Sequence, residues 1–276
     1  MSAARALSSA GGAAAKSKRP TATFTDHALK VAAAIAETDT AGLPSGCWLL
    51  HSVLPELCPL EQYPPLFKYI EEIPPTLSFM RKEIHRRQAT LFLTPAELEW
   101  LVNETPLPAH DDHPCKTAKY KFGRQTTQSC DRTILSEPPI RAMFKHVAAE
   151  CRRLKLDVSD YTMVHLNFYP YNRAGLGRHA DDEACILPDT PIFSFTLTMD
   201  ETGHPGKPRT MKFFRGKTNQ VCRAIALEHG ACVVMGGQCQ RKLEHQIPAA
   251  STKKTEGEST RINVTIRAFN RNYVPP

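Results

Sequence analysis

The stretch from 261 to 267 alternates strictly between polar and aliphatic side chains. The polar residues are Arg261, Asn263, Thr265 and Arg267, and the β-branched aliphatic residues between them are Ile262, Val264 and Ile266. A period of two predicts an extended strand whose two faces differ in polarity. Two guanidinium groups on the inner face of a strand are costly unless an anion compensates them. The stretch therefore predicts a sheet strand that contributes to an anion pocket.

A candidate metal site lies upstream of this strand. The sequence His179-Ala-Asp181 places an imidazole and a carboxylate two residues apart, so both point the same way on an extended segment. His245 supplies a second imidazole from a later predicted strand. Two histidines and one carboxylate with open coordination positions are typical of non-haem Fe(II) oxygenases. His165 and His229 are alternative ligands, and zinc is the alternative metal, although a zinc hydrolase leaves the inward arginines without a role.

The anion pocket suits a 2-oxo acid that chelates iron through its keto group and one carboxylate. The planar fork of arginine binds a carboxylate through two hydrogen bonds, so Arg261 is expected to bind the far carboxylate. Arg267 and Asn263 are then expected at the end next to the iron. Asn167 and Tyr169 share one face of the strand that ends at Tyr169, and they are expected to donate hydrogen bonds to the same ligand.

Composition places the chain among globular proteins. Its 276 residues, of which 41% are apolar, suffice for one large domain or two small ones. The formal charge of +7 favours anionic partners such as nucleic acid. The nine cysteines form no CxxC pair, which favours reduced thiols in an intracellular compartment. No apolar run reaches the length of a membrane span, so we expect no membrane contact, and nothing indicates an obligate protein partner.

The N-terminal part divides into two predicted regions. Residues 1–22 contain basic residues but no acidic ones, and they are expected to form a disordered tail. This tail suits a mitochondrial transit peptide or, through Lys16-Ser-Lys-Arg-Pro20, a nuclear signal; of the two compartments, we expect the nucleus. Residues 23–114 are expected to form a helical extension divided by prolines, with a helix over 25–38. Thr94-Pro-Ala-Glu97 is a capping box that predicts a further helix over 95–103.

Residues 115–276 are expected to form the catalytic domain. An amphipathic helix is predicted over 139–154. After Asp160, short β-branched and aromatic runs alternate with turn residues, which predicts an antiparallel sandwich or barrel. The predicted strands are 161–169, 192–199, 209–215, 222–227, 231–235, 243–247 and 261–269.

Several motifs between 115 and 270 resemble the AlkB family of Fe(II)/2-oxoglutarate dioxygenases. They are Asn167-Phe-Tyr169, His179-Ala-Asp181-Asp182-Glu183, Leu227-Glu-His-Gly230, Val233-Val-Met-Gly-Gly, Gln240, His245-Gln-Ile-Pro248 and Arg261-Ile-Asn-Val-Thr-Ile-Arg267. The last of these, RxNxTxR, is specific to this family among such oxygenases. The resemblance implies a mainly β fold with a helical N-terminal part, built on a double-stranded β-helix (jelly roll). It also implies Fe(II), 2-oxoglutarate and O2 as cofactor and cosubstrates.

The activity implied by the resemblance is oxidative demethylation of N-alkylated bases in DNA or RNA, with release of formaldehyde, succinate and CO2. The resemblance implies iron ligation by His179, Asp181 and His245. It implies 2-oxoglutarate binding by Asn167, Tyr169, Arg261, Asn263 and Arg267. Asp182 and Glu183 match an acidic segment that faces the target base in the nucleic-acid-repairing branches of the family.

The segment expected to cover the substrate departs from the family pattern. Phe122-Gly-Arg124-Gln-Thr-Thr-Gln-Ser is short, and no aromatic residue follows until Phe144. Arg124 belongs to a basic cluster with Lys119, Lys121 and Arg132 that is expected to contact phosphates. The missing aromatic residues favour an alternative in which the same chemistry acts on a methylated protein or a small molecule. A non-catalytic nucleic-acid-binding module is the second alternative.

Overall fold

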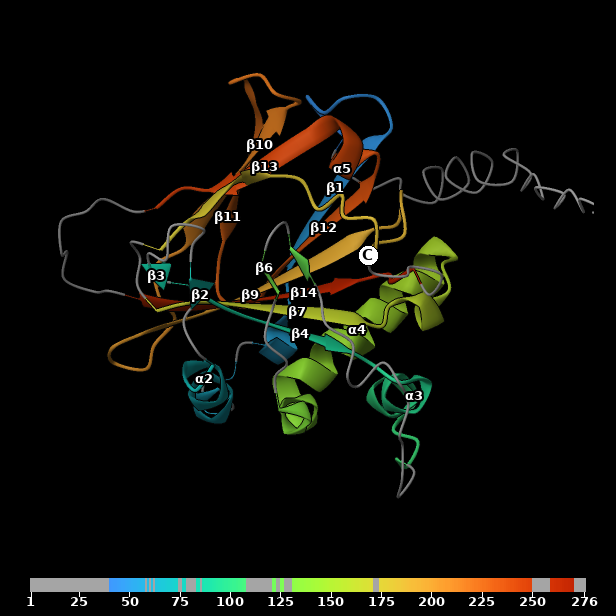
Figure 1. Cartoon of the computed structure of the whole chain (residues 1–276), viewed down its shortest axis with the longest axis vertical. Helices are drawn as coiled ribbons and strands as arrows, with labels where there is room; N and C mark the ends of the chain where they lie inside the picture. Colours follow the sequence, from blue (N-terminus) through green and yellow to red (C-terminus); the bar gives the residue numbers. More distant parts are fainter. Residues whose placement is uncertain are drawn as a thin grey trace, which may run out of the picture.

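The computed structural model describes residues 40–57, 59, 61, 63–73, 76–77, 83–84, 86–107, 121–122, 125–126, 131–170, 174–249 and 259–270. Two antiparallel sheets form the body of the molecule (Figure 1). The larger has the order β1 (Cys47–Val53), β12 (Ala231–Gly237), β9 (Ile192–Asp200), β14 (Ser259–Arg267), β7 (Met163–Tyr169), β4 (Arg87–Phe92). The smaller has the order β11 (Val221–Leu227), β10 (Arg209–Arg215), β13 (Leu243–Ile247), β8 (Leu176–His179). The architecture is the expected jelly-roll core.

Two short ribbons and four helices complete the described elements. The ribbons pair β2 (Thr76–Leu77) with β3 (Glu83–Ile84) and β5 (Lys121–Phe122) with β6 (Gln125–Thr126). The helices are α2 (Pro64–Glu71), α3 (Pro95–Asn103), α4 (Pro138–Leu154) and the single turn α5 (Cys239–Lys242). The 3-10 turns are η1 (Pro55–Leu57), η4 (Arg132–Ser136) and η5 (Val158–Asp160). None of the described helices is both long and apolar enough to cross a membrane.

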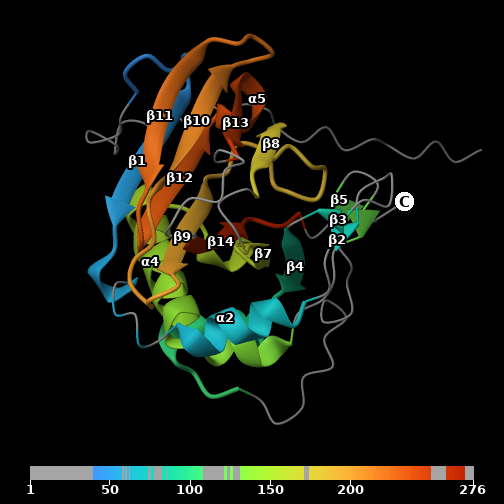
Figure 2. The same cartoon turned by 90° about the vertical axis from the view of Figure 1, so that its left-hand side faces the viewer.

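Helices α2 and α4 lie on the outer face of the larger sheet (Figure 2). The two faces of β14 show how the sequence produces this layering. Ile262, Val264 and Ile266 are fully buried in the apolar cluster that contains the helix residues. The residues that alternate with them face the smaller sheet, where a second cluster includes Ile192 and Phe213. The strand predicted from the alternation is therefore confirmed, and its polar face points between the two sheets.

Local signals set the helix boundaries. The side chain of Thr94 accepts a hydrogen bond from the backbone N–H of Glu97 at 3.1 Å, and the Thr94 N–H donates to the Glu97 carboxylate at 2.8 Å. This reciprocal cap, followed by a proline at the first helical position, starts α3 where the sequence predicts. Helix α4 starts one residue before its predicted boundary, also at a proline. The predicted strands after Asp160 are confirmed with end shifts of one or two residues.

The region predicted as a helical extension over 23–114 also contains strands, among them β1 and β4. Both strands join the larger sheet, β1 beside β12 and β4 beside β7. Nearly every side chain of β4 is buried, because the helices cover one face of the sheet and the second sheet covers the other. The helix predicted over 25–38 and the tail over 1–22 lie outside the described residues, and the domain boundary at 114 stays a prediction.

Candidate active site

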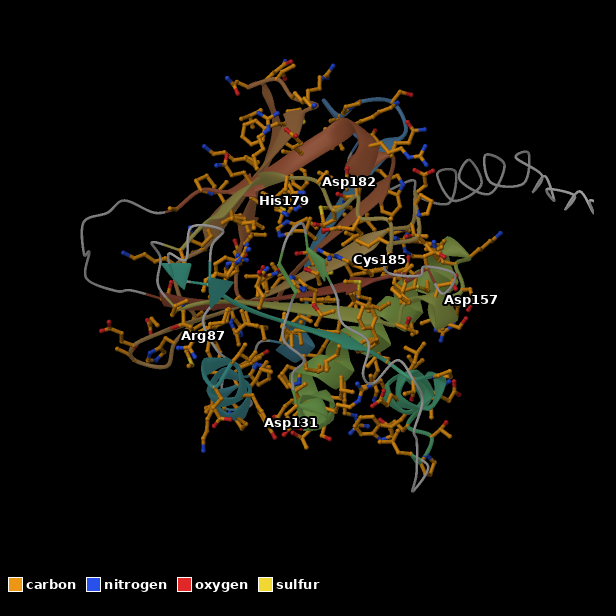
Figure 3. All side chains as sticks on the ribbon, in the orientation of Figure 1. Arg87, Asp131, Asp157, His179, Asp182 and Cys185 are labelled. Carbon is orange, nitrogen blue, oxygen red and sulfur yellow. The ribbon has the colours of Figure 1, made fainter. Side chains whose placement is uncertain are left out.

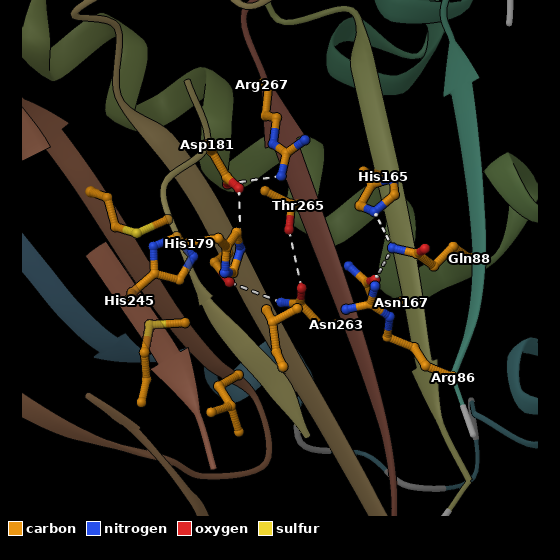
Figure 4. Close-up of a pocket in the computed structure, with 15 residues that line it drawn as sticks. Arg86, Gln88, His165, Asn167, His179, Asp181, His245, Asn263, Thr265 and Arg267 are labelled. Atoms are coloured by element: carbon orange, nitrogen blue, oxygen red, sulfur yellow. Dashed lines mark hydrogen bonds and ion pairs between the residues drawn. The ribbon is translucent and has the colours of Figure 1, made fainter. Parts of the chain in front are cut away.

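The structure brings His179, Asp181 and His245 together between the sheets (Figure 4). His179 ends β8, Asp181 follows in the next turn, and His245 lies in the middle of β13. The two histidines face each other as a cross-strand pair, with ring centroids 4.2 Å apart. One potential ligand atom from each residue lies within 4.8 Å of the others. Among the described residues, this is the group of three that could hold a metal ion.

Hydrogen bonds orient the His179 side chain and fix the backbone at Asp181. The Nδ1 of His179 lies 2.8 Å from the Gly177 carbonyl oxygen, which can only accept, so Nδ1 carries the proton. This leaves the Nε2 lone pair of a neutral His179 available for a metal. The backbone N–H of Asp181 donates to Oε1 of Gln240 at 2.9 Å. The turn that carries the carboxylate is thereby tied to α5.

Charges around the cluster favour the metal-binding forms of Asp181 and His245. Burial alone would raise the pKa of Asp181, but the Arg267 guanidinium and the two histidines hold it well below its usual value. One Arg267 nitrogen lies 2.8 Å from Oδ2 of Asp181. Burial, the neighbouring His179 and Arg267 lower the pKa of His245 to about 3, so this imidazole is neutral. Burial opposes protonation of His179, but the adjacent Asp181 raises the pKa of this histidine. A metal would therefore have to displace a proton from the protonated His179 imidazole.

The polar face of β14 continues across β7 in register. Arg261 lies opposite Tyr169, Asn263 opposite Asn167, and Thr265 opposite His165. All of these side chains are buried. The amide nitrogen of Asn263 donates to the Ser194 hydroxyl at 2.8 Å and to the Phe195 carbonyl at 2.9 Å. The hydroxyl of Thr265 donates to Oδ1 of Asn263 at 3.1 Å. The predicted anion pocket is therefore a polar surface fixed by two neighbouring strands.

Arg261 is the clearest indication of an anion-binding site. Its side chain is only 2% exposed, and its Cζ lies 4.0 Å from the centre of the Tyr169 ring. None of its three guanidinium nitrogens has a hydrogen-bond acceptor among the described residues, and neither has the Tyr169 hydroxyl. Burial lowers the pKa of Arg261 to about 10. Because unpaired buried charges are strongly unfavourable, this arrangement suits a bound carboxylate.

The residues predicted to contact the substrate do not line the pocket or lie outside the described residues. Asp182 is exposed and Glu183 half-buried; Asp182 lies close to His179 on the turn after β8 (Figure 3), but neither residue lines the pocket. Arg124 lies outside the described residues. Arg132, expected among phosphate-binding residues, instead forms an ion pair with the buried carboxylate of Glu97. A paired arginine is poorly available to a phosphate, so the phosphate contact predicted for Arg132 is wrong.

The two alternative histidine ligands have other partners. His165 lies between Thr90, whose hydroxyl is 2.9 Å from Nδ1, and Gln88, whose amide nitrogen is 3.3 Å from Nε2. Burial and the charge of Arg267 hold the pKa of His165 well below its usual value. Nδ1 of His229 lies 2.8 Å from the Thr198 carbonyl oxygen, and its ring packs edge-on against that of Tyr63.

Sequence reasoning missed the contribution of β4 to the pocket. Arg86 and Gln88 both line it, and the Gln88 amide donates to Oδ1 of Asn167 at 2.9 Å. Gln88 and Thr90 alternate with Ala89 and Leu91, so the period of two was present but short. Because β4 lies at the edge of the larger sheet, its inward polar residues close the pocket on one side.

Comparison with known proteins identifies the chemistry that this geometry suits. The family model of the 2OG-Fe(II) oxygenase superfamily matches residues 78–267. The chain belongs to this superfamily. Its members use Fe(II), 2-oxoglutarate and O2, and the chain is accordingly a dioxygenase. The match begins well before residue 115 and includes β4, in agreement with the pairing of β4 with β7.

Solved structures align with this chain to different extents. OsALKBH1 aligns with a TM-score of 0.38 and 17% identity over 82% of this chain and 99% of that one. IDO from Bacillus thuringiensis aligns with a TM-score of 0.50 and 9% identity over 97% and 100%. A bsmA homolog from Methylobium petroleophilum PM1 aligns with a TM-score of 0.46 and 12% identity over 78% and 85%. A search of curated protein sequences found no match. Of these three alignments, the one with IDO supports a shared fold, and at 9% identity it supports nothing beyond the fold.

The donor set fits the cofactor and cosubstrate of the superfamily. Two imidazoles and a carboxylate on one side of a cavity are the ligands that non-haem iron takes in such oxygenases. The unpaired Arg261 and Tyr169 on the same sheet face fit a dicarboxylate whose second carboxyl group lies away from the metal. Leu176, Met211, Met235 and Ile247 form an apolar part of the cavity wall, which limits the access of water.

Proposed function

We propose that this protein is an AlkB-type oxygenase that removes methyl groups from N-alkylated bases in DNA or RNA. The observation that carries the proposal is the conjunction of the His-Asp-His cluster with the polar face of β14, in which Arg261 and Arg267 bracket Asn263 and Thr265. This RxNxTxR pattern is the part of the sequence most specific to the AlkB family. The formal charge of +7 is consistent with a polyanionic substrate.

In this proposal His179, Asp181 and His245 hold Fe(II), while Arg261 and Tyr169 bind the far carboxylate of 2-oxoglutarate. When bound, iron, O2 and 2-oxoglutarate supply the oxidation of an N-methyl C–H bond, and the hydroxymethyl product then loses formaldehyde. Arg267 holds Oδ2 of Asp181 at 2.8 Å, so this carboxylate presents one oxygen to the metal. Gln88, Asn167 and Asn263 fix the polar wall, and the apolar wall excludes water from the reacting groups.

The substrate has to leave the base stack to reach this site. Because the metal cluster lies between two sheets, a base within a duplex cannot approach it, and flipped or single-stranded bases are required. Asp182 and Glu183 follow the ligand Asp181 directly, and we propose that they accept hydrogen bonds from the exocyclic amine of the base. The basic segment around Arg124 is proposed to contact the phosphates.

Mass spectrometry tests the proposal. The full chain is incubated with Fe(II), 2-oxoglutarate and O2, together with single- or double-stranded DNA or RNA that contains N-methylated adenine or cytosine. We expect loss of the methyl group in at least one of these substrates, accompanied by equal amounts of succinate and formaldehyde. Asp181→Ala should abolish both products. Glu201→Ala, which changes an exposed acid in a turn, should retain them and serves as the matched control.

Other outcomes separate the alternatives. Succinate formation without demethylation of any nucleic acid would support the oxygenase activity but refute the nucleic-acid substrate. This is the result expected if the substrate is a methylated protein or a small molecule. Nucleic-acid binding without succinate formation would indicate a binding module. Affinity for a nucleic acid should also fall steeply with salt, because phosphate contacts release counterions, whereas affinity for a small molecule should not.

A further inference from the structure

Arg86 lies in one row with Tyr169 and Arg261, a row that runs across neighbouring strands of the larger sheet. Arg87 pairs with Phe168 in the register between β4 and β7, and the preceding residue, Arg86, therefore lies opposite Tyr169. On its other side Tyr169 pairs with Arg261. Neighbouring strands are about 4.8 Å apart, so the two arginines originate about 10 Å apart, with the tyrosine between them. A side chain as long as arginine spans half of that distance easily.

Arg86 faces the pocket and has no counterion there. It is 8% exposed, it lines the pocket, and its Nε has no hydrogen-bond acceptor among the described residues (Figure 4). Asp181 is the one acidic residue among those that line the pocket, and Arg267 already pairs with it. The unpaired donors are Nε of Arg86, the Tyr169 hydroxyl and the Arg261 nitrogens. They lie in one row, six residues along β14 from the Arg267 that pairs with Asp181.

The number of these donors exceeds what one arginine would provide. A carboxylate has two oxygens and about four sites that accept hydrogen bonds, so it can satisfy two guanidinium groups and a phenol together. Burial of two guanidinium groups side by side is unfavourable without such a ligand, because each loses hydration and they repel one another; Arg261 has three unpaired nitrogens here and Arg86 has its Nε. The arrangement thus has the donors and the charge for a fully buried carboxylate.

We propose that Arg86 and Arg261 form a two-arginine clamp, with Tyr169 between them, for the far carboxylate of the 2-oxo acid. The inference rests on the proposed binding of 2-oxoglutarate at this site and adds Arg86 as a residue that determines which 2-oxo acid is accepted. The clamp selects a dicarboxylate over a monocarboxylate, because a 2-oxo acid without the second carboxyl group supplies no counterion for the two buried guanidinium groups.

Calorimetric titration of the full chain tests the clamp without turnover. Mn2+ replaces Fe(II), O2 is removed, and the ligands are 2-oxoglutarate and 2-oxopentanoate, which carries a methyl group in place of the far carboxylate. Arg86→Gln should raise the Kd of 2-oxoglutarate by about 10- to 100-fold, the range for a hydrogen bond to a charged group. The Kd of 2-oxopentanoate should change by less than about 2-fold or fall. Arg86→Lys, which keeps the charge but loses the planar fork, should lie between wild type and Arg86→Gln.

Arg87→Gln is the matched control. Arg87 is the next residue along the chain, but its side chain points to the other face of the sheet and donates to the Ile73 carbonyl at 3.0 Å, near α2 (Figure 3). This variant should bind 2-oxoglutarate as wild type does. Thermal unfolding of each variant verifies that it is folded, and the Arg86→Lys titration gives the test if Arg86→Gln is not.

The failure of the clamp differs from the failure of the proposed function. An unchanged Kd of 2-oxoglutarate in Arg86→Gln, with a large increase in Arg261→Gln, would overturn the clamp and leave the proposed function standing. Equal weakening of 2-oxoglutarate and 2-oxopentanoate would also overturn it, because Arg86 would then act at the metal end or through the fold. No binding of 2-oxoglutarate by wild type would remove the proposed function and the clamp together.

Discussion

Glu97 should be one of the residues whose replacement destabilises the fold most. Its buried carboxylate accepts hydrogen bonds from the backbone N–H of Thr94 at 2.8 Å and from Nε of Arg132 at 2.6 Å, and a second Arg132 nitrogen also pairs with it. It therefore caps α3 and joins this helix to the segment that leads into α4. Glu97→Ala should cost about 1 kcal/mol for the cap and about 2 kcal/mol for the ion pair. The second figure lies below that of a fully buried pair because the Arg132 side chain is 25% exposed.

Urea unfolding of a double-mutant cycle measures this effect. Glu97→Ala should lower the free energy of unfolding by about 3 kcal/mol, and Arg132→Met should lower it by less. The coupling between the two substitutions should be about 1.5–2 kcal/mol, because each removes the same ion pair. Glu99→Ala is the control, since Glu99 is exposed on the same helix and should change the free energy by less than about 0.5 kcal/mol. A loss below about 1 kcal/mol for Glu97→Ala, or coupling near zero, would refute the reasoning.

Three further predictions concern metal binding, pH and packing. Mn2+ at about 100 times its Kd should raise the Tm of wild type by about 5 °C, and Asp181→Ala should abolish the shift; a shift that persists would place the metal elsewhere. Burial lowers the pKa of His229, so the unfolded chain binds more protons, and stability should fall as pH drops below about 6.5; His229→Gln should flatten this dependence in thermal unfolding between pH 7 and 5. Gly236→Ala should cost about 1–3 kcal/mol in urea unfolding, because its Cβ would overlap the buried ring of the cross-strand neighbour Trp48; an unchanged midpoint would contradict this.

Much of the fold was predictable because its signals are local. The capping box at Thr94 fixes the start of α3 within four residues of sequence, and the alternation from Arg261 to Arg267 identifies both faces of β14. The metal cluster was also accessible, because His179 and Asp181 are neighbours in sequence and His245 lies on a well-defined strand. In each case a pattern of only a few residues is enough to identify the element or the ligands.

The contribution of β4 was not predictable in the same way. Gln88 contacts Asn167 across 79 positions of sequence, and which strands pair over such distances depends on how the whole sheet packs. The alternation in β4 covers only Gln88 to Leu91, which is too short to distinguish a strand from other structures. Arg132 illustrates the same point, since nothing near it in sequence indicates that Glu97 neutralises it.

The position of β14 has a consequence for biosynthesis. This strand lies between β9 and β7 in the larger sheet, yet it follows every other described strand in the chain. Until residues 259–267 leave the ribosome, the inner edges of β9 and β7 have no partner, and unpaired strand edges promote aggregation. A nascent chain arrested before residue 259 would expose two unpaired strand edges and would lack both Arg261 and Arg267. We therefore expect chaperone dependence to be greatest just before β14 leaves the ribosome.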